Sequence, residues 1–221
     1  MQMFSNSLGW LRALPGLLLL CAVSLAAQAA GTTDSVLDRF FRDLETLSAG
    51  FEQTLRDADG KVTQHATGQL SIQRPGRFRW DYRTPYEQLV LGDGERLWTY
   101  DADLAQATVK PQEQALAGTP ALLLSAAEQP RELFDIQPLP MRDSEAWFEL
   151  TPKSEQGIGD SQFDQLRLGF EGDSLVAMEL IDSFEQTTQI RFRGLQRNLP
   201  LAAGLFDFTP PSGVDVIGDA P

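Results

Sequence analysis

Thiol and imidazole side chains are nearly missing from this chain of 221 residues, which has one cysteine, Cys21, and one histidine, His65. A zinc site would have to rely on carboxylates, because zinc normally takes several Cys or His ligands. His65 lies between Gln64 and Ala66 with no acidic residue nearby to orient it as a general base. The chain also lacks a G-x-S-x-G elbow and an S-x-x-K pair. We therefore expect no metal, no cofactor and no enzyme activity.

The acidic residues form no recognisable site either. Asp57-Ala-Asp59-Gly60 begins like a calcium loop, but Lys61 stands where a third oxygen ligand belongs and Gly68 where the closing Glu belongs. A hairpin turn explains this segment better, and the same holds for Asp101 and Asp103. The chain contains 31 Asp and Glu, yet no spacing marks a pair for glycoside hydrolysis. A hydrolase that uses two carboxylates is the alternative from the enzyme class.

Residues 1–29 have the pattern of a cleaved secretory signal peptide. Arg12 ends a short basic start, a Leu-rich apolar run follows, and Ala27-Gln28-Ala29 matches an A-x-A cleavage site. An uncleaved membrane anchor is the alternative, but the Pro15-Gly16 break and the small residues at the end favour cleavage. Cys21 follows a bulky Leu rather than the small residue that precedes a lipidated cysteine. We expect an exported chain that has lost its cysteine and has no disulfide.

Basic residues are scarce in the remaining 192 residues, 30–221. They hold 17 Lys and Arg against 31 Asp and Glu, a net charge of −14, because Arg12 leaves with the signal. Such an acidic chain disfavours nucleic acid and anionic membranes as partners. The length suits one domain with a sizeable core, and no repeat, low-complexity tract or linker divides it. We expect residues 30–221 to form a single domain.

Turn residues divide this domain into many short strands and a few helices. Apolar residues at helical spacing predict a helix over residues 34–49, capped by Thr33 or Asp34 and ended by Gly50. Thr119-Pro120 predicts the start of a second helix over residues 121–127, which ends before Pro130. One helical turn is expected within residues 199–205. Strands are expected over residues 51–56, 62–73, 78–83, 88–91, 95–101, 105–110, 134–136, 147–151, 163–170, 175–181 and 189–195, with a short strand at the start of the 206–216 tail.

Antiparallel strands without helical crossovers between them exclude a doubly wound α/β fold. We expect a mainly β protein with an α lid. Its architecture would be an open, incomplete antiparallel β-barrel of about ten to eleven strands covered by short helices. The helices must then close the mouth or the concave side of the sheet.

Apolar side chains gather on one face of several strands. Phe78, Trp80 and Tyr82 alternate with charged residues, so this strand turns an aromatic face inward and a charged face to water. The expected helix at 121–127 is apolar nearly all round. These surfaces either form an ordinary core or line a pocket for an apolar ligand. The candidate residues are Phe51, Leu70, Ile72, Phe78, Trp80, Leu89, Leu91, Trp98, Leu122, Leu123, Leu124, Phe148, Leu150, Leu168, Phe170, Met178 and Leu180.

Five segments in order carry a resemblance to a known family. They are Ala49–Thr54, Gly68–Trp80, Glu87–Asp101, Thr119–Leu124 and Phe208–Val216. Together they make the chain similar to the outer-membrane lipoprotein carrier (LolA) family over nearly all of its exported part. The resemblance implies an unclosed barrel whose concave apolar side is covered by a helical lid, with the candidate residues lining a cavity for acyl chains.

The resemblance also implies a latch, partners and a compartment. Arg74 would hold carbonyl groups of the lid, because a guanidinium offers five donors in a fixed geometry. The protein would be a monomeric periplasmic chaperone of a Gram-negative bacterium. It would take triacylated lipoproteins from an inner-membrane lipoprotein-releasing ABC transporter and deliver them to the outer-membrane receptor LolB. The alternatives within the fold are a LolB-like receptor, which needs a lipidated cysteine, and a lipid-sensing periplasmic regulator.

Overall fold

The computed structural model describes residues 34–112, 120–153 and 163–218, with the backbone alone for residues 120–122. Three helices in this part are α1 (Val36–Arg42), α3 (Pro120–Ser125) and α4 (Pro130–Leu133). The strands are β1 (Thr46–Arg56), β2 (Val62–Gln73), β3 (Arg77–Thr84), β4 (Gln88–Asp93), β5 (Arg96–Asp101), β6 (Gln106–Pro111), β7 (Phe134–Arg142), β8 (Glu145–Pro152), β9 (Gln165–Glu171), β10 (Ser174–Ile181), β11 (Thr187–Arg197) and β12 (Asp215–Gly218).

All twelve strands belong to one sheet, in the order β12-β6-β5-β4-β3-β2-β1-β11-β10-β9-β8-β7. Neighbours are antiparallel except β12, which pairs parallel to β6. The sheet has two free edges, β12 and β7, so the barrel is open. This confirms the predicted fold class, with one strand more than expected. The tail strand lies at the end of the tail, over Asp215–Gly218, rather than at its start.

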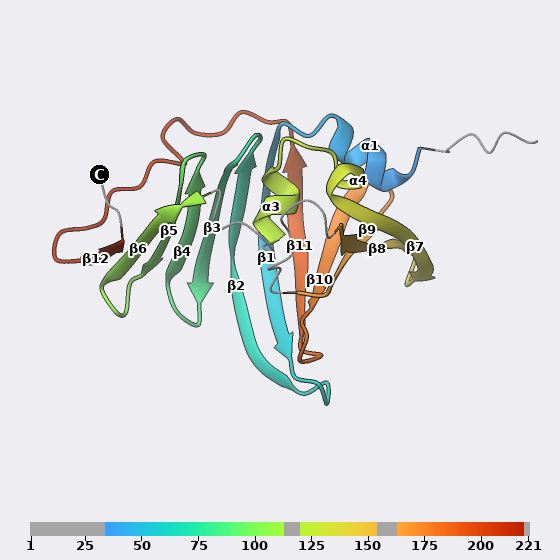
Figure 1. Cartoon of the computed structure of the whole chain (residues 1–221), viewed down its shortest axis with the longest axis horizontal. Coiled ribbons are helices and arrows are strands. Elements are labelled where there is room, and N and C mark those ends of the chain that lie inside the picture. The colour runs from blue at the N-terminus through green and yellow to red at the C-terminus, as the bar shows by residue number, and fades with distance from the viewer. Residues whose placement is uncertain (1–33, 113–119, 154–162, 219–221) are drawn as a thin grey trace, which may run out of the picture. The chain divides into compact units, whose positions relative to one another are not determined.

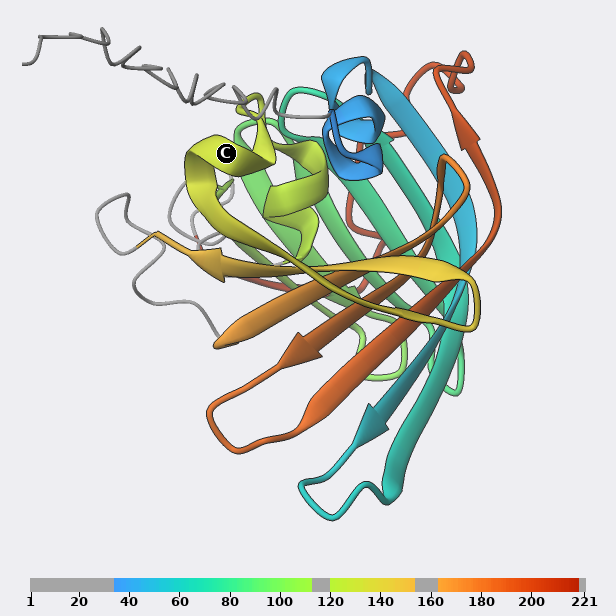
Figure 2. The ribbon, with the colours of Figure 1, turned by 90° about the vertical axis from the view of Figure 1, so that its right-hand side faces the viewer.

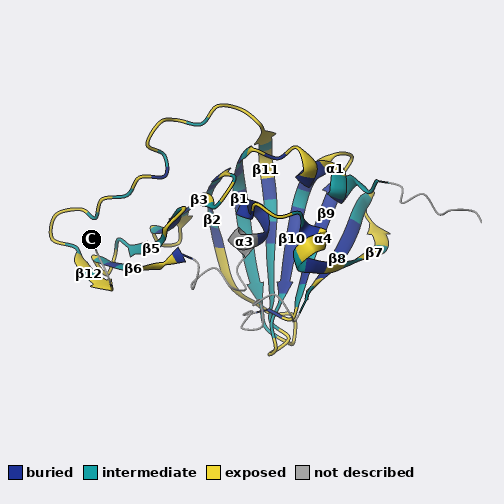
Figure 3. Cartoon of the chain, turned by 45° about the horizontal axis from the view of Figure 1, so that its top comes forward, coloured by how far each residue is buried: buried dark blue, intermediate teal, exposed yellow. Residues whose placement is uncertain are grey.

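The sheet curls, and the helices lie inside the curve (Figures 1 and 2). Buried residues recur along β8, β9, β10 and β11 (Figure 3). A short helix is stable in water only when its apolar face packs on something larger. The curved sheet supplies that surface, and the helices in turn exclude water from its concave face. No helix in the described ranges is long and apolar enough to cross a membrane.

Helix α1 is shorter than the sequence pattern predicted. Ser35 is its N-cap, and the Ser35 side chain and the Asp38 carboxylate form a capping box. The helix ends at Arg42, and β1 begins at Thr46, so the prediction of helix over residues 43–49 was wrong. In β1 the buried residues alternate, as in Leu47, Ala49 and Phe51. That period of two overrides the helical spacing that Leu47 also satisfied.

The other predicted helices also differ in detail. The second helix, α3, ends at Ser125 rather than at Ala127, and the residue expected as its cap, Thr119, lies outside the described residues. Pro130 does not only stop a helix; it occupies the first turn of α4, where its missing N–H has no cost. Residues 203–206 form a turn rather than the helical turn expected within 199–205.

Candidate functional site

The concave face of the sheet carries a large apolar cluster, here called the concave cluster. Strands and helices both contribute to it, and nearly all its side chains are withdrawn from water. It unites thirteen of the predicted candidates, Phe170 among them, and the side chain of Leu122 lies outside the described residues. The predicted members are Phe51, Leu70, Ile72, Phe78, Trp80, Leu123, Leu124, Phe148, Leu150, Leu168, Phe170, Met178 and Leu180.

Strand register explains why these residues meet. Leu70 of β2 lies opposite Trp80 of β3, and Trp80 lies opposite Val90 of β4. Residues that are paired across strands share a face, so one apolar row crosses the sheet beneath the helices. Helix α1 adds Leu37, Phe40 and Phe41 to the same cluster. The Phe40 ring meets the Phe170 ring edge to face, with centroids 5.4 Å apart.

Three predicted candidates lie on the opposite face. Leu89 and Leu91 alternate with Val90, and Trp98 pairs with Leu91, so all three side chains point to the convex side of the sheet. There they form a second cluster with Val109, here called the outer cluster, onto which Tyr100, Phe208 and Val216 pack. Their assignment to the same cavity as Trp80 is therefore corrected.

A glycine makes room for an aromatic ring on the concave face. Gly68 pairs with Phe51, and a Cβ built at Gly68 would lie 2.7 Å from the Phe51 ring and 2.0 Å from the Asp81 carbonyl oxygen. Phe51 in turn packs edge to face against Trp80 and Tyr82. The sequence pattern does mark Gly68 as unusual within a long strand, which is typical of a close approach.

Arg74, the predicted latch, follows β2 and reaches the elements that cover the concave cluster. Its Nε donates to the Ala126 carbonyl at 2.5 Å, Nη1 to the Phe41 carbonyl at 3.0 Å and Nη2 to the Glu128 carbonyl at 2.8 Å. One side chain thus binds the end of α1 and the segment between α3 and α4. Burial lowers the pKa of Arg74, but a guanidinium stays charged at any ordinary pH.

Two further contacts near this turn were not expected from the sequence. The main-chain N–H of Gly76 donates to the Ser125 carbonyl at 2.8 Å, a second tether to the end of α3. Gln112 is 5% exposed; its Nε2 donates to the Gly76 carbonyl at 2.6 Å, and its Oε1 accepts from the Gly94 N–H at 3.1 Å. A buried amide that satisfies two main-chain groups stabilises the turn that presents Arg74. No local motif around Gln112 signals this role.

An ion pair joins α1 to α4. Arg131 Nε lies 2.6 Å from Asp38 Oδ1, and Arg131 Nη2 lies 3.0 Å from Asp38 Oδ2. This bidentate pair, with help from Ser35, lowers the pKa of Asp38 to about 2 despite partial burial. Asp38 therefore caps α1 and binds α4 at the same time, so the two helices are coupled through one carboxylate.

Two polar atoms lie within the apolar face. The Tyr82 hydroxyl donates to Gln53 Oε1 at 3.0 Å, and burial raises the pKa of Tyr82 to about 12. The Trp80 indole nitrogen is buried, and no acceptor lies within hydrogen-bond range of it among the described residues. Trp80 as a whole is 5% exposed.

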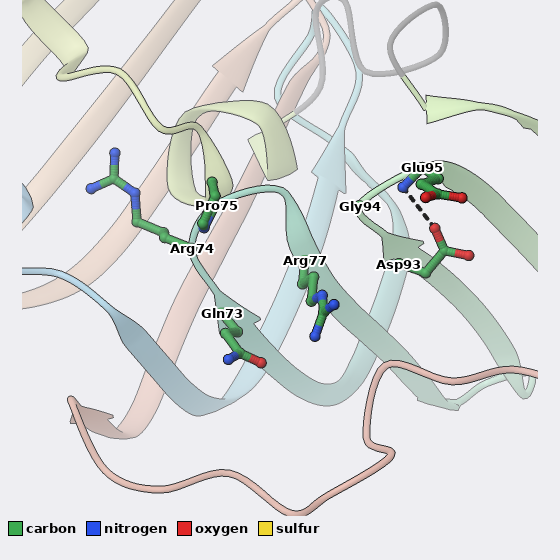
Figure 4. A pocket seen from close by; sticks show the side chains of 7 residues that line it. All are labelled: Gln73, Arg74, Pro75, Arg77, Asp93, Gly94 and Glu95. Atoms are coloured by element: carbon green, nitrogen blue, oxygen red, sulfur yellow. Dashed lines mark hydrogen bonds between the residues drawn. The ribbon is translucent and has the colours of Figure 1, made fainter.

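A polar pocket lies beside the latch, outside the apolar cluster. It has a volume of about 520 Å³ and is lined by Gln73, Arg74, Pro75, Arg77, Asp93, Gly94 and Glu95. In Figure 4 the Arg74 side chain points away from the Asp93 and Glu95 carboxylates. Asp93 instead accepts the Glu95 N–H at 2.8 Å within its own turn. The Arg74 guanidinium is therefore directed toward the elements that cover the concave cluster and not toward the carboxylates of this pocket.

The convex face of β7 to β11 is ionic, in contrast to the concave face. Arg167–Glu149 joins the neighbouring strands β9 and β8, and Arg193–Glu52 joins β11 to β1. Arg142–Glu179 and Arg191–Glu145 each join strands that are separated by two others. Trp147 also lies on this face, opposite Gly169 and beneath the Arg142 guanidinium at 4.7 Å. Its indole nitrogen is buried and, like that of Trp80, has no acceptor in the described part.

The acidic segments behave as turns. Asp57 accepts the Lys61 N–H at 2.9 Å, and Asp101 accepts the Leu104 N–H at 3.0 Å, so both carboxylates stabilise hairpin connections as predicted. Among the described residues, no group of three or more His, Cys, Asp or Glu side chains could hold a metal ion. His65 is exposed, with its Nδ1 3.5 Å from the Thr54 hydroxyl.

Comparison with known proteins gives a consistent result. Residues 42–209 match the family described as outer membrane lipoprotein carrier protein LolA. The outer-membrane lipoprotein carrier protein of Methylobacillus flagellatus is 44% identical over 183 residues, which cover 83% of this chain and 87% of that protein. The protein of the same name from Neisseria meningitidis serogroup C is 40% identical over 197 residues, covering 89% and 92%. A solved structure of an uncharacterized conserved protein from Thermus thermophilus shares the fold, with a TM-score of 0.50 and 12% identity over 82% of this chain and 96% of that one.

Proposed function

The chain belongs to the family of the outer membrane lipoprotein carrier protein LolA, and we propose that it is a periplasmic chaperone that carries lipoproteins to the outer membrane. Its relatives are named as carriers, and we propose a carrier rather than an enzyme here as well. Residues 1–29 would be the export signal, and residues 30–221 the carrier domain.

The observation that carries this proposal is the apolar concave face, closed by short helices that one arginine holds. An acyl chain gains about 0.8 kcal/mol for each methylene that it buries, so a surface of this kind suits lipid tails. The covering helices α3 and α4 have six and four residues, and helices this short do not hold their place without outside contacts. Moving them aside would expose the concave cluster to a ligand.

The latch explains how a carrier releases its cargo. Cargo that enters must break the bonds from Arg74 to the Phe41, Ala126 and Glu128 carbonyls. The free energy of those bonds is subtracted from the affinity for acyl chains, which keeps binding weak enough for onward transfer. We propose that the donor is an inner-membrane lipoprotein-releasing ABC transporter and the acceptor the receptor LolB. The cargo is triacylated lipoprotein, and the carrier acts as a monomer.

A transfer experiment with the full chain tests the function. The protein is recovered from the periplasm, where intact mass should show a chain that begins at Ala30, and is incubated with ATP and inner-membrane vesicles that hold the release complex. It should leave with bound lipoprotein and pass it to outer-membrane vesicles that carry the receptor. Failure of the folded protein to take up lipoprotein contradicts the carrier role, and a chain acylated at Cys21 contradicts the cleaved signal.

The same assay tests the latch. Arg74→Leu should still take up lipoprotein but deliver it roughly tenfold less or worse, because the closed state no longer competes with the cargo. Arg77→Leu is the matched control: Arg77 lines the same polar pocket and is exposed, with the same charge. Unimpaired delivery by Arg74→Leu would show that the latch does not set the affinity.

A further inference from the structure

Trp80 is an exception within the concave cluster, because it places a polar atom in apolar surroundings. Its ring packs edge to face on Phe51 at 5.4 Å, and its indole nitrogen is buried without an acceptor among the described residues. The phenolic donor of this face, Tyr82, is by contrast satisfied by Gln53. Buried indole N–H groups normally find a partner, so an unpaired one needs an explanation.

We propose that the Trp80 indole N–H binds a carbonyl oxygen of the acylated cargo. This inference rests on the proposed carrier function and adds a polar contact to a site that otherwise recognises hydrocarbon. The acceptor would be an ester or amide carbonyl at the head end of the acyl chains, where lipid becomes polar. Such a carbonyl is the only hydrogen-bond acceptor that an acyl chain itself can bring into this face.

Arg74 and Trp80 differ in how the structure uses their hydrogen-bond donors. Arg74 donates to three carbonyls of the covering elements, one from each of its nitrogens, whereas the Trp80 donor has no acceptor in the described part of the chain. Entry of a lipid would reverse this: the latch loses its acceptors, and the indole gains one. The bond to Trp80 would then offset part of the lost latch bonds, but only for a ligand that carries a carbonyl.

This arrangement makes Trp80 a specificity residue. Hydrocarbon burial alone does not distinguish an acyl chain from an alkyl chain of equal length, because both remove the same apolar area from water. A buried donor that is left unpaired by the wrong ligand does distinguish them. The site would therefore favour acylated cargo over alkyl detergents of similar length.

Nuclear magnetic resonance can observe this bond directly in the protein of residues 30–221. That chain has three tryptophans, Trp80, Trp98 and Trp147, so its indole N–H signals can be assigned with the three single Trp→Phe variants. The probes are a synthetic triacylated cysteine peptide and dodecyltrimethylammonium, an alkyl cation that has no hydrogen-bond acceptor. The chemical shift of the Trp80 indole N–H proton should move downfield when the peptide binds. It should not move downfield when the alkyl cation binds.

Affinity supplies the second measurement. Trp80→Phe keeps an aromatic ring but removes the donor, so it should bind the triacylated peptide about fivefold more weakly than the wild type and dodecyltrimethylammonium equally well. Trp147→Phe is the matched control, because it removes an indole N–H that likewise has no acceptor among the described residues, from the ionic convex face. It should leave both affinities unchanged.

The outcomes separate the two proposals. Suppose that the wild type binds the peptide, but that its Trp80 signal does not move downfield and Trp80→Phe binds the peptide as tightly as the wild type. The indole contact is then overturned, and the carrier function stands. If the folded wild type binds no triacylated peptide, both are overturned. Should Trp80→Phe fail to fold, the downfield shift in the wild type alone decides for or against the contact.

Discussion

The two apolar clusters of this sheet are covered in different ways. The concave cluster lies beneath α1, α3 and α4, and the covering segment around α3 is tied by side-chain bonds from Arg74 and one main-chain bond from Gly76. The outer cluster lies beneath the C-terminal segment. That segment continues into β12, which pairs with β6 over Asp215–Gly218 and becomes part of the sheet itself.

The difference lies in what must break for each cover to leave. Arg79 donates to the Leu205 carbonyl at 3.3 Å, and the Phe208 ring packs on Trp98 and Tyr100 at 5.4 and 5.6 Å. Removing this cover would also cost the β12 ladder. Removing α3 and the segment after it breaks a few hydrogen bonds and leaves every strand pair intact. We infer that the outer cluster is a permanent core, whereas the concave cluster is a core that opens.

The largest expected effect comes from deleting a side chain in each cluster. Trp98→Ala should lower the free energy of global unfolding by about 3–5 kcal/mol, because Trp98 is 5% exposed beneath a cover that cannot leave alone. Leu124→Ala in α3 removes a side chain that is 0% exposed. This substitution should lower the free energy of global unfolding by less than about 2 kcal/mol. Since α3 opens locally, the loss of its packing cannot cost more than the free energy of that local opening.

Urea denaturation of both variants measures this contrast. The slope with denaturant should match the wild type in each case if the unfolded states are alike. Equal losses of several kcal/mol in the two variants would mean that α3 is as permanent as the C-terminal cover.

The second effect concerns the latch alone. Arg74→Lys keeps the charge but replaces a planar fork with a point donor, which cannot span carbonyls on Phe41, Ala126 and Glu128 together. Amide hydrogen exchange in α3 and in residues 126–129 should accelerate roughly tenfold to a hundredfold. Exchange in β4, β5 and β6 should not change. Arg77→Lys is the control, and acceleration across the whole sheet in Arg74→Lys would argue against a local opening.

The smallest effect is the pH dependence of the α1 to α4 contact. The pKa of Asp38 is lowered to about 2 in the folded state by Arg131, so its stabilisation is present above the usual carboxyl range and is lost as the pH falls toward 2. The contribution should be about 1 kcal/mol, because the Arg131 side chain is 53% exposed and water screens the pair.

Asp38→Asn checks this contribution. At pH 6 the variant should be less stable than the wild type, and the difference should shrink between about pH 4 and pH 2 as Asp38 takes up a proton. A difference that is constant over this range would show that the contribution of Asp38 does not depend on the charge of its carboxylate.

Alternation along single strands was the reliable signal in the sequence. It predicted correctly that Phe78, Trp80 and Tyr82 share a face, because a strand turns successive side chains to opposite sides. It did not predict which face of the sheet Leu89 and Leu91 take. Val90 between them is apolar too, so the sequence looks the same whether Val90 or its two neighbours face the concave side. Only the pairing of Val90 with Trp80 decides it.

Turn chemistry and helix length show the same division. Asp57-Ala-Asp59-Gly60 formed the expected hairpin turn, because its bonds lie between residues that are close in the sequence. The end of α1 was missed, because residues 43–49 satisfy two periods and the choice depends on pairing with β2 and β11. The roles of Gln112 and Arg131 were missed for the same reason: their partners are distant in the sequence.

The sequence by itself determined the properties that depend on neighbours along the chain: the mainly β class, the approximate place of most strands, the hairpin turns, and the resemblance that singled out Arg74. Tertiary structure decided which faces meet. Register sent Leu89, Leu91 and Trp98 to the convex side, brought Arg74 to the carbonyls of the covering elements and left the Trp80 indole without an acceptor among the described residues. Local patterns record the period of a strand, whereas a face acquires its partner only when the sheet curls and strands far apart in the sequence come to lie side by side.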